Sequence, residues 1–262
     1  MNQEKMDKLI YEIENIVRAS AKQIETVKRE TIEIENKEGI GNIVTQYDKK
    51  IQTELKDGLL KLLPKASFIG EENDYGKILK SGYTFIVDPI DGTTNFSRGL
   101  SLSAISVALL KDAEPYIGVC YNPYTDEMFI AQKGQGAYLN GKSIKVSNKK
   151  LQEGILLTGN APYYADIREK SLITLQNLAM IASDFRRFGS AVIELCNIAC
   201  GRAEVYFELK LQPWDFAAGM LIVEEAGGKV TQMNGEKMTF DKVTSIFASN
   251  NKEDYLKYIY NN

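Results

Sequence analysis

The feature that most restricts the fold is a series of short apolar or alternating segments between residues 67 and 146. They are SFIG (67–70), YTFIVD (83–88), LSAISVALL (102–110), YIGVCYN (116–122), EMFIAQ (127–132) and GAYLNGKSIKV (136–146). Turn residues separate these segments, and each has the length and pattern of a strand. Asn140-Gly141 is typical of a tight hairpin turn. The series therefore predicts a sizeable, largely antiparallel sheet.

The rest of the chain predicts helices and a second sheet. Helical periodicity extends over residues 4–35 and from 48 to 63, where Pro64 ends the helix. The stretch IENKEGIGNIV (34–44) has two glycines and mixed charge, which predicts a mobile surface loop. In the second half, expected strands (155–158, 185–188, 204–209 and 245–250) alternate with expected helices (167–181, 190–200, 214–228 and the C-terminal end).

These elements predict a mixed α and β protein in layers, with two sheets. A boundary between residues 145 and 153 divides the chain into an N-terminal half, 1–148, and a C-terminal half, 149–262. The length of 262 residues permits either one large domain or two packed halves.

Composition narrows the location and the partners. The chain is 44% hydrophobic and 26% charged, with a net charge of −3, and it carries neither a basic patch for nucleic acid nor a polybasic membrane surface. The N-terminus is charged and amphipathic, unlike a secretory signal, and no apolar run reaches the ~20 residues that span a bilayer. Three cysteines, few and odd in number, favour a reducing compartment, so we expect a cytoplasmic protein.

The chain contains no histidine. This excludes Ser-His-Asp and Cys-His catalysis, phosphotransfer through histidine, and zinc bound by histidine. A hydrolase with this composition must use carboxylates, hydroxyls, backbone amides or a hard metal ion.

Two aspartates follow a buried strand in FIVDPIDGTTNF (85–96). Asp88 lies at the end of the apolar run, and Pro89-Ile90 predict a short turn that returns Asp91 to its side. A helix is expected from Gly92, with Asp91 as its N-cap and free amides that suit a phosphate oxygen. Because two carboxylates this close repel each other, we expect a cation between them.

Further acids lie elsewhere in the chain. Glu71 and Glu72 follow the strand SFIG, and Asp215 lies at the start of an apolar helix, beside the only tryptophan. A carboxylate buried there is costly unless it caps the helix or binds metal. Without histidine, an all-oxygen site favours Mg²⁺ or Mn²⁺. Cation and phosphate together predict metal-dependent phosphoryl transfer.

The motifs GEE, DPIDGTTNF and WDFAAGMLIVEEAGG, in this order, resemble the inositol monophosphatase family of lithium-sensitive, Mg²⁺-dependent sugar phosphatases. The likeness extends from about Ile43 to Val230 and includes NIVTQYDKK, GQGAYLNG and RRFGSAVIELCNIACGRAEVYFE. It implies an α-β-α-β-α sandwich of the inositol monophosphatase/fructose-1,6-bisphosphatase type. It also implies a homodimer that hydrolyses small phosphorylated substrates.

The resemblance implies a ligand set for two or three Mg²⁺ ions, with Mn²⁺ as a substitute. The side chains of Glu71, Asp88 and Asp91 and the carbonyl oxygen of Ile90 would hold the first metals, and Asp215 would complete a second site. A metal-activated water, oriented by Thr93 and Glu71, would attack in line, while Asp48 would hydrogen-bond Thr93. Lys37 is a candidate for a third metal site or a phosphate contact, and Glu72 is expected to be a supporting or solvated acid.

The resemblance also implies substrate contacts. The amides of Gly92 and Thr93 would bind phosphate oxygens, and the implied contacts to substrate hydroxyls are Asp91, Gly189, Ser190, Ala191 and Glu208. Arg186 and Arg187 match an arginine pair of bacterial members, and alternation along a strand points only one of them inward. Inositol 1-phosphate is the first expected substrate. NADP(H), fructose 1,6-bisphosphate and nucleotide phosphates are alternatives, as is a non-catalytic protein that binds metal or a partner.

Overall fold

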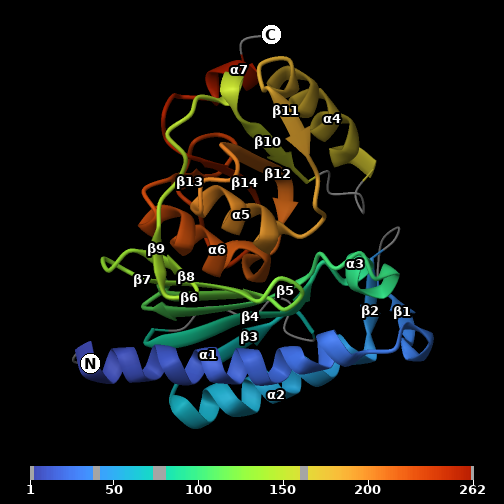
Figure 1. Cartoon of the computed structure of the whole chain (residues 1–262), viewed down its shortest axis with the longest axis vertical. Helices are drawn as coiled ribbons and strands as arrows, with labels where there is room; N and C mark the ends of the chain where they lie inside the picture. The colour runs from blue at the N-terminus through green and yellow to red at the C-terminus, as the bar shows by residue number, and fades with distance from the viewer. Residues whose placement is uncertain (1–2, 38–41, 73–80, 160–164, 261–262) are drawn as a thin grey trace.

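Two large sheets and three helical layers alternate through the molecule, and a separate two-stranded sheet lies beside them (Figure 1). The computed structural model describes residues 3–37, 42–72, 81–159 and 165–260. From bottom to top in Figure 1, the layers are α1 and α2, a seven-stranded sheet, α5 and α6, a five-stranded sheet, and α4 and α7. The predicted α-β-α-β-α sandwich is therefore confirmed.

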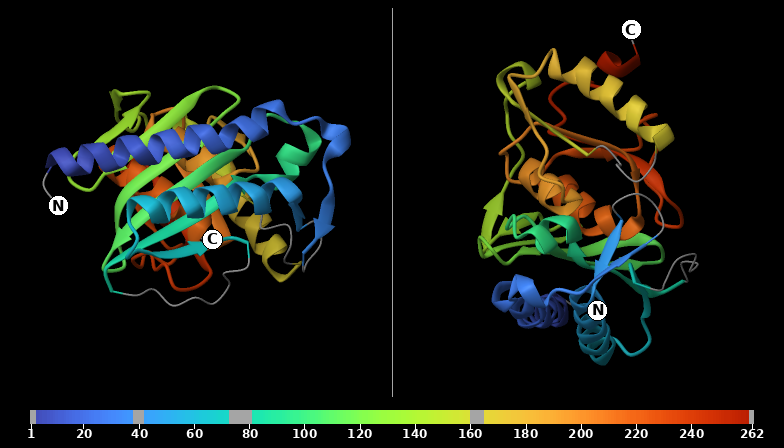
Figure 2. Two further views of the ribbon diagram at one scale, coloured as in Figure 1. Left: turned by 90° about the horizontal axis from the view of Figure 1, so that it is seen from below. Right: turned by 90° about the vertical axis from the view of Figure 1, so that its right-hand side faces the viewer.

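The seven-stranded sheet contains the strands expected between residues 67 and 146. In spatial order it comprises β3 (Ser67–Gly70), β4 (Tyr83–Asp91), β5 (Ala104–Lys111), β6 (Glu114–Asn122), β7 (Glu127–Gln132), β8 (Ala137–Leu139) and β9 (Lys142–Ile144). Only the β3–β4 pair is parallel, so the predicted antiparallel meander is confirmed. Helices α1 (Gln3–Thr26) and α2 (Gln46–Leu62) lie across its outer face (Figure 2).

The five-stranded sheet is built by the second half of the chain. Its order is β11 (Asp184–Arg186), β10 (Ile155–Thr158), β12 (Val205–Leu211), β14 (Thr244–Ser249) and β13 (Lys229–Thr231). Helices α4 (Ala165–Ala179) and α7 (Lys257–Tyr260) cover its outer face. The two sheets divide the chain between Ile144 and Ile155, and the domain boundary at residue 148 remains a prediction.

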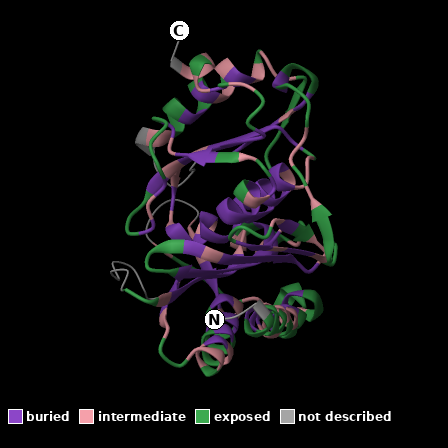
Figure 3. Cartoon of the chain, turned by 90° about the vertical axis from the view of Figure 1, so that its left-hand side faces the viewer, coloured by how far each residue is buried: buried purple, intermediate pink, exposed green. Residues whose placement is uncertain are grey.

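Helices α5 (Ala191–Ala199) and α6 (Pro213–Glu225) fill the space between the sheets. Both are apolar on nearly every side, and almost all of their residues are buried, as Figure 3 shows in purple. A helix that is apolar all round can only be stable inside a core. The sequence of α6 therefore places its N-terminus, with Asp215, in the middle of the molecule.

The N-terminal region differs from the prediction. The first helix ends at Thr26 instead of continuing to residue 35, and a short 3₁₀ turn, Arg29–Thr31, follows it. The residues predicted as a loop form part of a hairpin, in which β1 (Ile34–Asn36) pairs with β2 (Ile43–Thr45). The remainder of that predicted loop, 38–41, lies outside the described residues. Ile24 is the last buried residue of α1, and Val27 and Ile32 pack against the same core without being part of the helix, so their apolar spacing imitated a longer helix.

The three-residue edge strand β13 was not predicted, since so short a segment carries little periodicity. Among the helices in the described part of the chain, none combines the length and the apolar character needed to cross a membrane.

Candidate functional site

A cleft of about 380 Å³ opens where the end of β4 meets the N-termini of α5 and α6 and the strand β12. Its volume is within the range of pockets that hold small molecules. Both halves of the chain line it. The predicted site residues that line it are Glu71, Asp88, Ile90, Asp91, Gly92, Thr93, Arg187, Gly189, Ser190, Ala191, Glu208 and Asp215.

A bulge in β4 brings Asp88 and Asp91 to the same face of the sheet. Residues three apart on a regular strand point to opposite faces. Here Asp88 pairs with Ser106 and Asp91 with Ala104, so β4 contains one residue more than β5 between these pairs. Within the bulge, the backbone N–H of Ile90 donates to Asp88 Oδ1 at 3.0 Å. The extra residue thus turns both carboxylates toward α5 and α6.

This geometry corrects two predictions. Pro89-Ile90 form no reversing turn, because β4 continues to Asp91. The N-cap of the following helix, α3 (Thr93–Arg98), is Gly92 and not Asp91. Gly92 has φ +83°, a conformation that costs glycine little, and the carboxylate of Asp91 contacts the other half of the chain instead.

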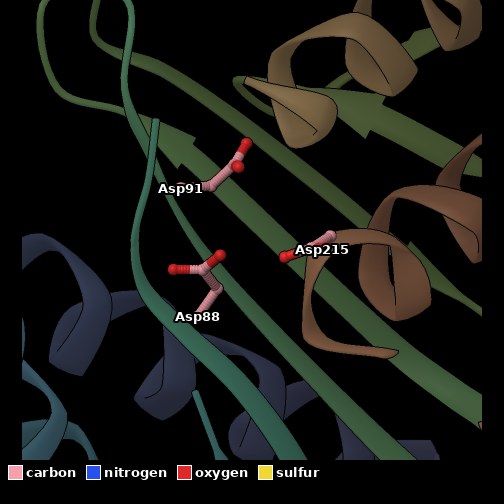
Figure 4. A group of neighbouring side chains, drawn as sticks. All are labelled: Asp88, Asp91 and Asp215. Carbon is pink, nitrogen blue, oxygen red and sulfur yellow. The ribbon is translucent and has the colours of Figure 1, made fainter. Parts of the chain in front are cut away.

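Asp215 occupies the third position of α6, after Pro213 at its start. Its Oδ2 accepts a hydrogen bond from the backbone N–H of Gln212 at 2.7 Å, as in a capping box. Asp215 is therefore both a helix cap and a component of the cleft. One carboxylate oxygen from each of Asp88, Asp91 and Asp215 lies within 4.8 Å of the other two (Figure 4).

The electrostatics of this cluster fit a cation. Burial raises the pKa of Asp88 and Asp215 well above the ordinary range, and the negative charges of neighbouring acids raise it further. Burial also raises the pKa of Asp91 to about 7, against hydrogen bonds from Ser190 and Val192 that lower it. An all-oxygen set of crowded carboxylates is the donor chemistry of hard divalent ions, so these residues fit such a metal.

Lys37 lies beside the predicted ligand Glu71. Its Nζ donates to Glu71 Oε1 at 2.8 Å and to Glu72 Oε1 at 2.7 Å. Burial lowers the pKa of Lys37, but the two carboxylates outweigh burial and raise it overall. Glu72 is buried and paired with Lys37, in agreement with a supporting acid and not with a solvated one.

Asp48 and Thr93 meet as the resemblance implies. Thr93 Oγ1 lies 3.1 Å from Asp48 Oδ1 and 3.1 Å from the carbonyl oxygen of Ile90, and its single proton can serve one acceptor at a time. Asp48 is fully buried and also forms the capping box of α2 with Thr45. Burial raises the pKa of Asp48 to about 7, although hydrogen bonds from Thr45 lower it.

The segment between β11 and α5 connects the two halves of the site. Ser190 donates its hydroxyl to Asp91 Oδ2, and the N–H of Val192 reaches the same oxygen at 2.8 Å. Gly92 and Gly189 allow the two segments to approach closely, because a Cβ on Gly92 would lie 3.3 Å from the Gly189 carbonyl oxygen and a Cβ on Gly189 would lie 3.2 Å from Asn95 Nδ2. Arg187 lines the cleft, whereas Arg186 turns away to pair with Asp184 at 2.6 Å. The structure thus identifies the inward arginine.

Several residues of the cleft were not predicted from the sequence. Tyr206 donates its hydroxyl to the expected substrate contact Glu208 at 2.8 Å. Asn95 connects the halves, since its Nδ2 lies 2.7 Å from the carbonyl oxygen of Phe188 and 2.8 Å from that of Leu102. Glu194 and Lys210 also line the cleft. The available signal was a single acid in the otherwise apolar segment AVIELCNIAC, which marks Glu194 as exceptional.

Comparison with known proteins places this site in a family. The sequence profile described as "Inositol monophosphatase family" matches residues 2–262. The chain belongs to this family. An "Inositol-1-monophosphatase" of Rhizobium meliloti is 36% identical over 225 residues, covering 84% of this chain and 85% of the relative. A "Nus factor SuhB" of Pasteurella multocida is 37% identical over 193 residues, covering 73% and 72%.

Solved structures agree with this membership. The extragenic suppressor protein suhB of Bartonella henselae is 34% identical, with a TM-score of 0.85 and 94% of each chain covered. The inositol monophosphatase SaIMPase-II, solved with inositol monophosphate bound, is 28% identical, with a TM-score of 0.79 and 95% and 90% covered. The same protein has been solved with 2′-AMP. Inositol monophosphatases depend on metal and act on small phosphorylated substrates, so the chain is a metal-dependent phosphatase by family.

Proposed function

We propose that the chain is a Mg²⁺-dependent phosphomonoesterase that hydrolyses small polyol phosphates such as inositol 1-phosphate. The observation that carries this proposal is the convergence of Asp88, Asp91 and Asp215 in a cleft that Glu71 and Thr93 also line. Asp88 and Asp91 belong to one strand, β4, whereas Asp215 belongs to α6 in the other half of the chain. Only a bulge in one strand and the N-terminus of a buried helix bring them together.

The residues divide into metal ligands and groups that orient the reaction. Glu71, Asp88, Asp91, the carbonyl oxygen of Ile90 and Asp215 would hold the ions. Bound Mg²⁺ would neutralise phosphate charge, activate water and stabilise the leaving oxygen. The Thr93 hydroxyl would orient the attacking water. Its own direction would be set by Asp48 Oδ1, which lies 3.1 Å from Thr93 Oγ1, as does the carbonyl oxygen of Ile90. The backbone amides of Gly92 and Thr93 would hold phosphate oxygens.

Cleft residues other than the proposed metal ligands support a polyol or another small polar group as the substrate. Glu208, whose carboxylate Tyr206 holds by a hydrogen bond, offers acceptor oxygens to hydroxyls, and Ser190 and Ala191 border the same space. The cleft is large enough for one small phosphorylated molecule. The complexes of SaIMPase-II with inositol monophosphate and with 2′-AMP are compatible with this reading, and they keep nucleotide phosphates among the alternatives.

A phosphate-release assay tests the proposal. We expect turnover of inositol 1-phosphate with millimolar Mg²⁺, loss of turnover with EDTA, and inhibition by lithium. A panel with fructose 1,6-bisphosphate, NADP and 2′-AMP would rank the alternatives. If no phosphomonoester is hydrolysed with Mg²⁺ or Mn²⁺ by folded protein, the proposal is wrong.

The second candidate is a non-catalytic family member that binds metal or a protein. It is favoured by relatives named "Nus factor SuhB", since such a name describes something other than a phosphatase. Against it, this chain retains Glu71, Asp88, Asp91, Thr93 and Asp215 together in the cleft. The phosphate-release assay separates the two candidates.

The arginine pair offers a matched test of substrate binding. Replacing Arg187 with alanine should raise KM about tenfold for substrates that carry a second anionic group, because loss of an ion pair to a ligand commonly costs one to a few kcal/mol. Arg186→Ala is the matched control, since its side chain pairs with Asp184 on the surface and should leave KM unchanged. Steady-state kinetics on the two variants measure this. Equal effects on KM would contradict the assignment of Arg187.

A further inference from the structure

The peptide between Phe188 and Gly189 is fixed from two sides. On one side, the carbonyl oxygens of Phe188 and Gly189 lie 2.7 Å and 3.2 Å from the donor Asn95 Nδ2, which belongs to α3 in the other half of the chain. On the opposite side, the N–H of Phe188 donates to Glu194 Oε1 at 2.6 Å, and the N–H of Gly189 also bonds to the Glu194 carboxylate. The next residue, Ser190, holds Asp91.

A carboxylate at position 194 lowers the stability of the fold. Glu194 lies one turn into the apolar helix α5 and is 2% exposed. Its second oxygen, Oε2, is buried and has no hydrogen-bond partner among the described residues. An unpartnered carboxylate oxygen in a core lowers stability. Burial raises the pKa of Glu194 well above its usual range, and Glu208 across the cleft adds to this.

Glu204 shows what a purely structural buried acid looks like in this fold. It is 3% exposed and accepts a hydrogen bond from the backbone N–H of Ile155. In these respects it matches Glu194. Glu204 joins β12 to β10, however, and it does not line the cleft, whereas Glu194 does.

The geometry points to Glu194 as a positioning residue that fixes the turn at Phe188–Gly189. By fixing this turn, Glu194 keeps Ser190 and Val192 hydrogen-bonded to Asp91. It also keeps Arg187 at the wall of the cleft. Asp91 belongs to the N-terminal half, but its orientation depends on the C-terminal half through the hydrogen bonds that Ser190 and Val192 donate to its Oδ2. Loss of the acceptor at Glu194 would free the turn. Asp91 would then be oriented less well toward the ions, and metal affinity would fall together with turnover.

The inference rests on the proposed function, and it is tested by comparing Glu194→Met with Glu204→Met. Methionine keeps the length of the side chain and removes the acceptor. For Glu194→Met we expect kcat to fall about tenfold and the Mg²⁺ concentration giving half of the maximal rise in Tm to increase about tenfold, as for loss of a hydrogen bond to a charged group. Glu194→Gln keeps an acceptor for the N–H of Phe188, so its kcat and its Mg²⁺ dependence should both lie close to the wild-type values. Glu204→Met should lower Tm and change neither quantity.

The outcomes separate a positioning role from a structural one. Wild-type kcat and Mg²⁺ dependence in Glu194→Met would overturn the inference, and so would the same loss of both quantities in Glu204→Met. If Glu194→Met does not fold, Glu194→Asp carries the test, because it withdraws the acceptor by one methylene and should weaken Mg²⁺ binding. If the wild-type protein hydrolyses no phosphomonoester, the proposed function fails, and the Mg²⁺ dependence of Tm still decides the role of Glu194.

Discussion

Asp88→Asn should reduce kcat/KM for the preferred phosphomonoester by about a thousandfold or more, while the protein stays folded. Asparagine has the shape of aspartate but lacks its charge, and one oxygen of Asp88 lies within 4.8 Å of an oxygen from each of Asp91 and Asp215. If the ion binds more weakly, the reaction loses both the neutralisation of phosphate charge and the activation of water. A thousandfold reduction corresponds to a loss of about 4 kcal/mol of transition-state stabilisation. Phosphate release under saturating Mg²⁺ measures the effect.

The same variant should be more stable than the wild type when no metal is present. Burial and the neighbouring acids disfavour the ionised form of Asp88, and a neutral amide removes this cost. Thermal unfolding in EDTA checks the point. Asp184→Asn is the control, since Asp184 is exposed and pairs only with surface groups, so neither activity nor Tm should change. Activity of Asp88→Asn within about tenfold of wild type would contradict the role of Asp88 as a ligand.

The pattern of residues within one segment was enough to predict an element where that segment alone determines both its structure and its chemistry. The strand that begins at Tyr83, the hairpin at Asn140-Gly141 and the apolar helix after Pro213 were all predicted, because alternation, turn residues and uniform apolarity are local signals. The strand continues to Asp91, however, beyond its predicted end at Asp88. The absence of histidine excluded the competing hydrolase chemistries. The resemblance then grouped Glu71, the Asp88–Asp91 pair and Asp215, which lie far apart in the sequence.

The features that the sequence did not predict depend mostly on contacts between distant segments of the chain. The bulge in β4 is defined by its register against β5, which the sequence of β4 alone does not state. The end of α1 at Thr26 is not marked by a loss of apolar spacing, because Val27 and Ile32 still pack against the core beyond it. Likewise, Asn95 and Glu194 act on the backbone of the turn at Phe188–Gly189, and a hydrogen bond to a backbone group leaves no pattern in the partner's sequence.

The metal-free protein should lose stability as pH rises from about 4 to 7, and Mg²⁺ should restore it. Burial raises the pKa of Asp48 and Asp91 to about 7 in the folded state, whereas aspartates in an unfolded chain have a pKa of about 3.9. Between these values the folded protein holds more protons than the unfolded chain, so the free energy of unfolding falls with rising pH. The stabilisation is complete below about pH 4 and is lost above pH 7. Because the folded-state and unfolded-state pKa values differ by about three units for each aspartate, each contributes a loss on the order of a few kcal/mol.

Divalent ions bind the deprotonated carboxylates, so their effect on Tm must have the opposite pH dependence. At pH 8, Mg²⁺ at about 100 times its dissociation constant adds about 2.7 kcal/mol, or roughly 5–10 °C in Tm for a chain of this size. At pH 5.5 the same concentration should raise Tm much less, because protons compete for Asp88, Asp91 and Asp215. Thermal unfolding at both pH values, with KCl at matched ionic strength as the control, measures the difference. A Mg²⁺-induced rise in Tm that is equal at pH 5.5 and pH 8 would mean that the ion binds elsewhere, since only a site built from protonatable acids couples metal to protons in this direction.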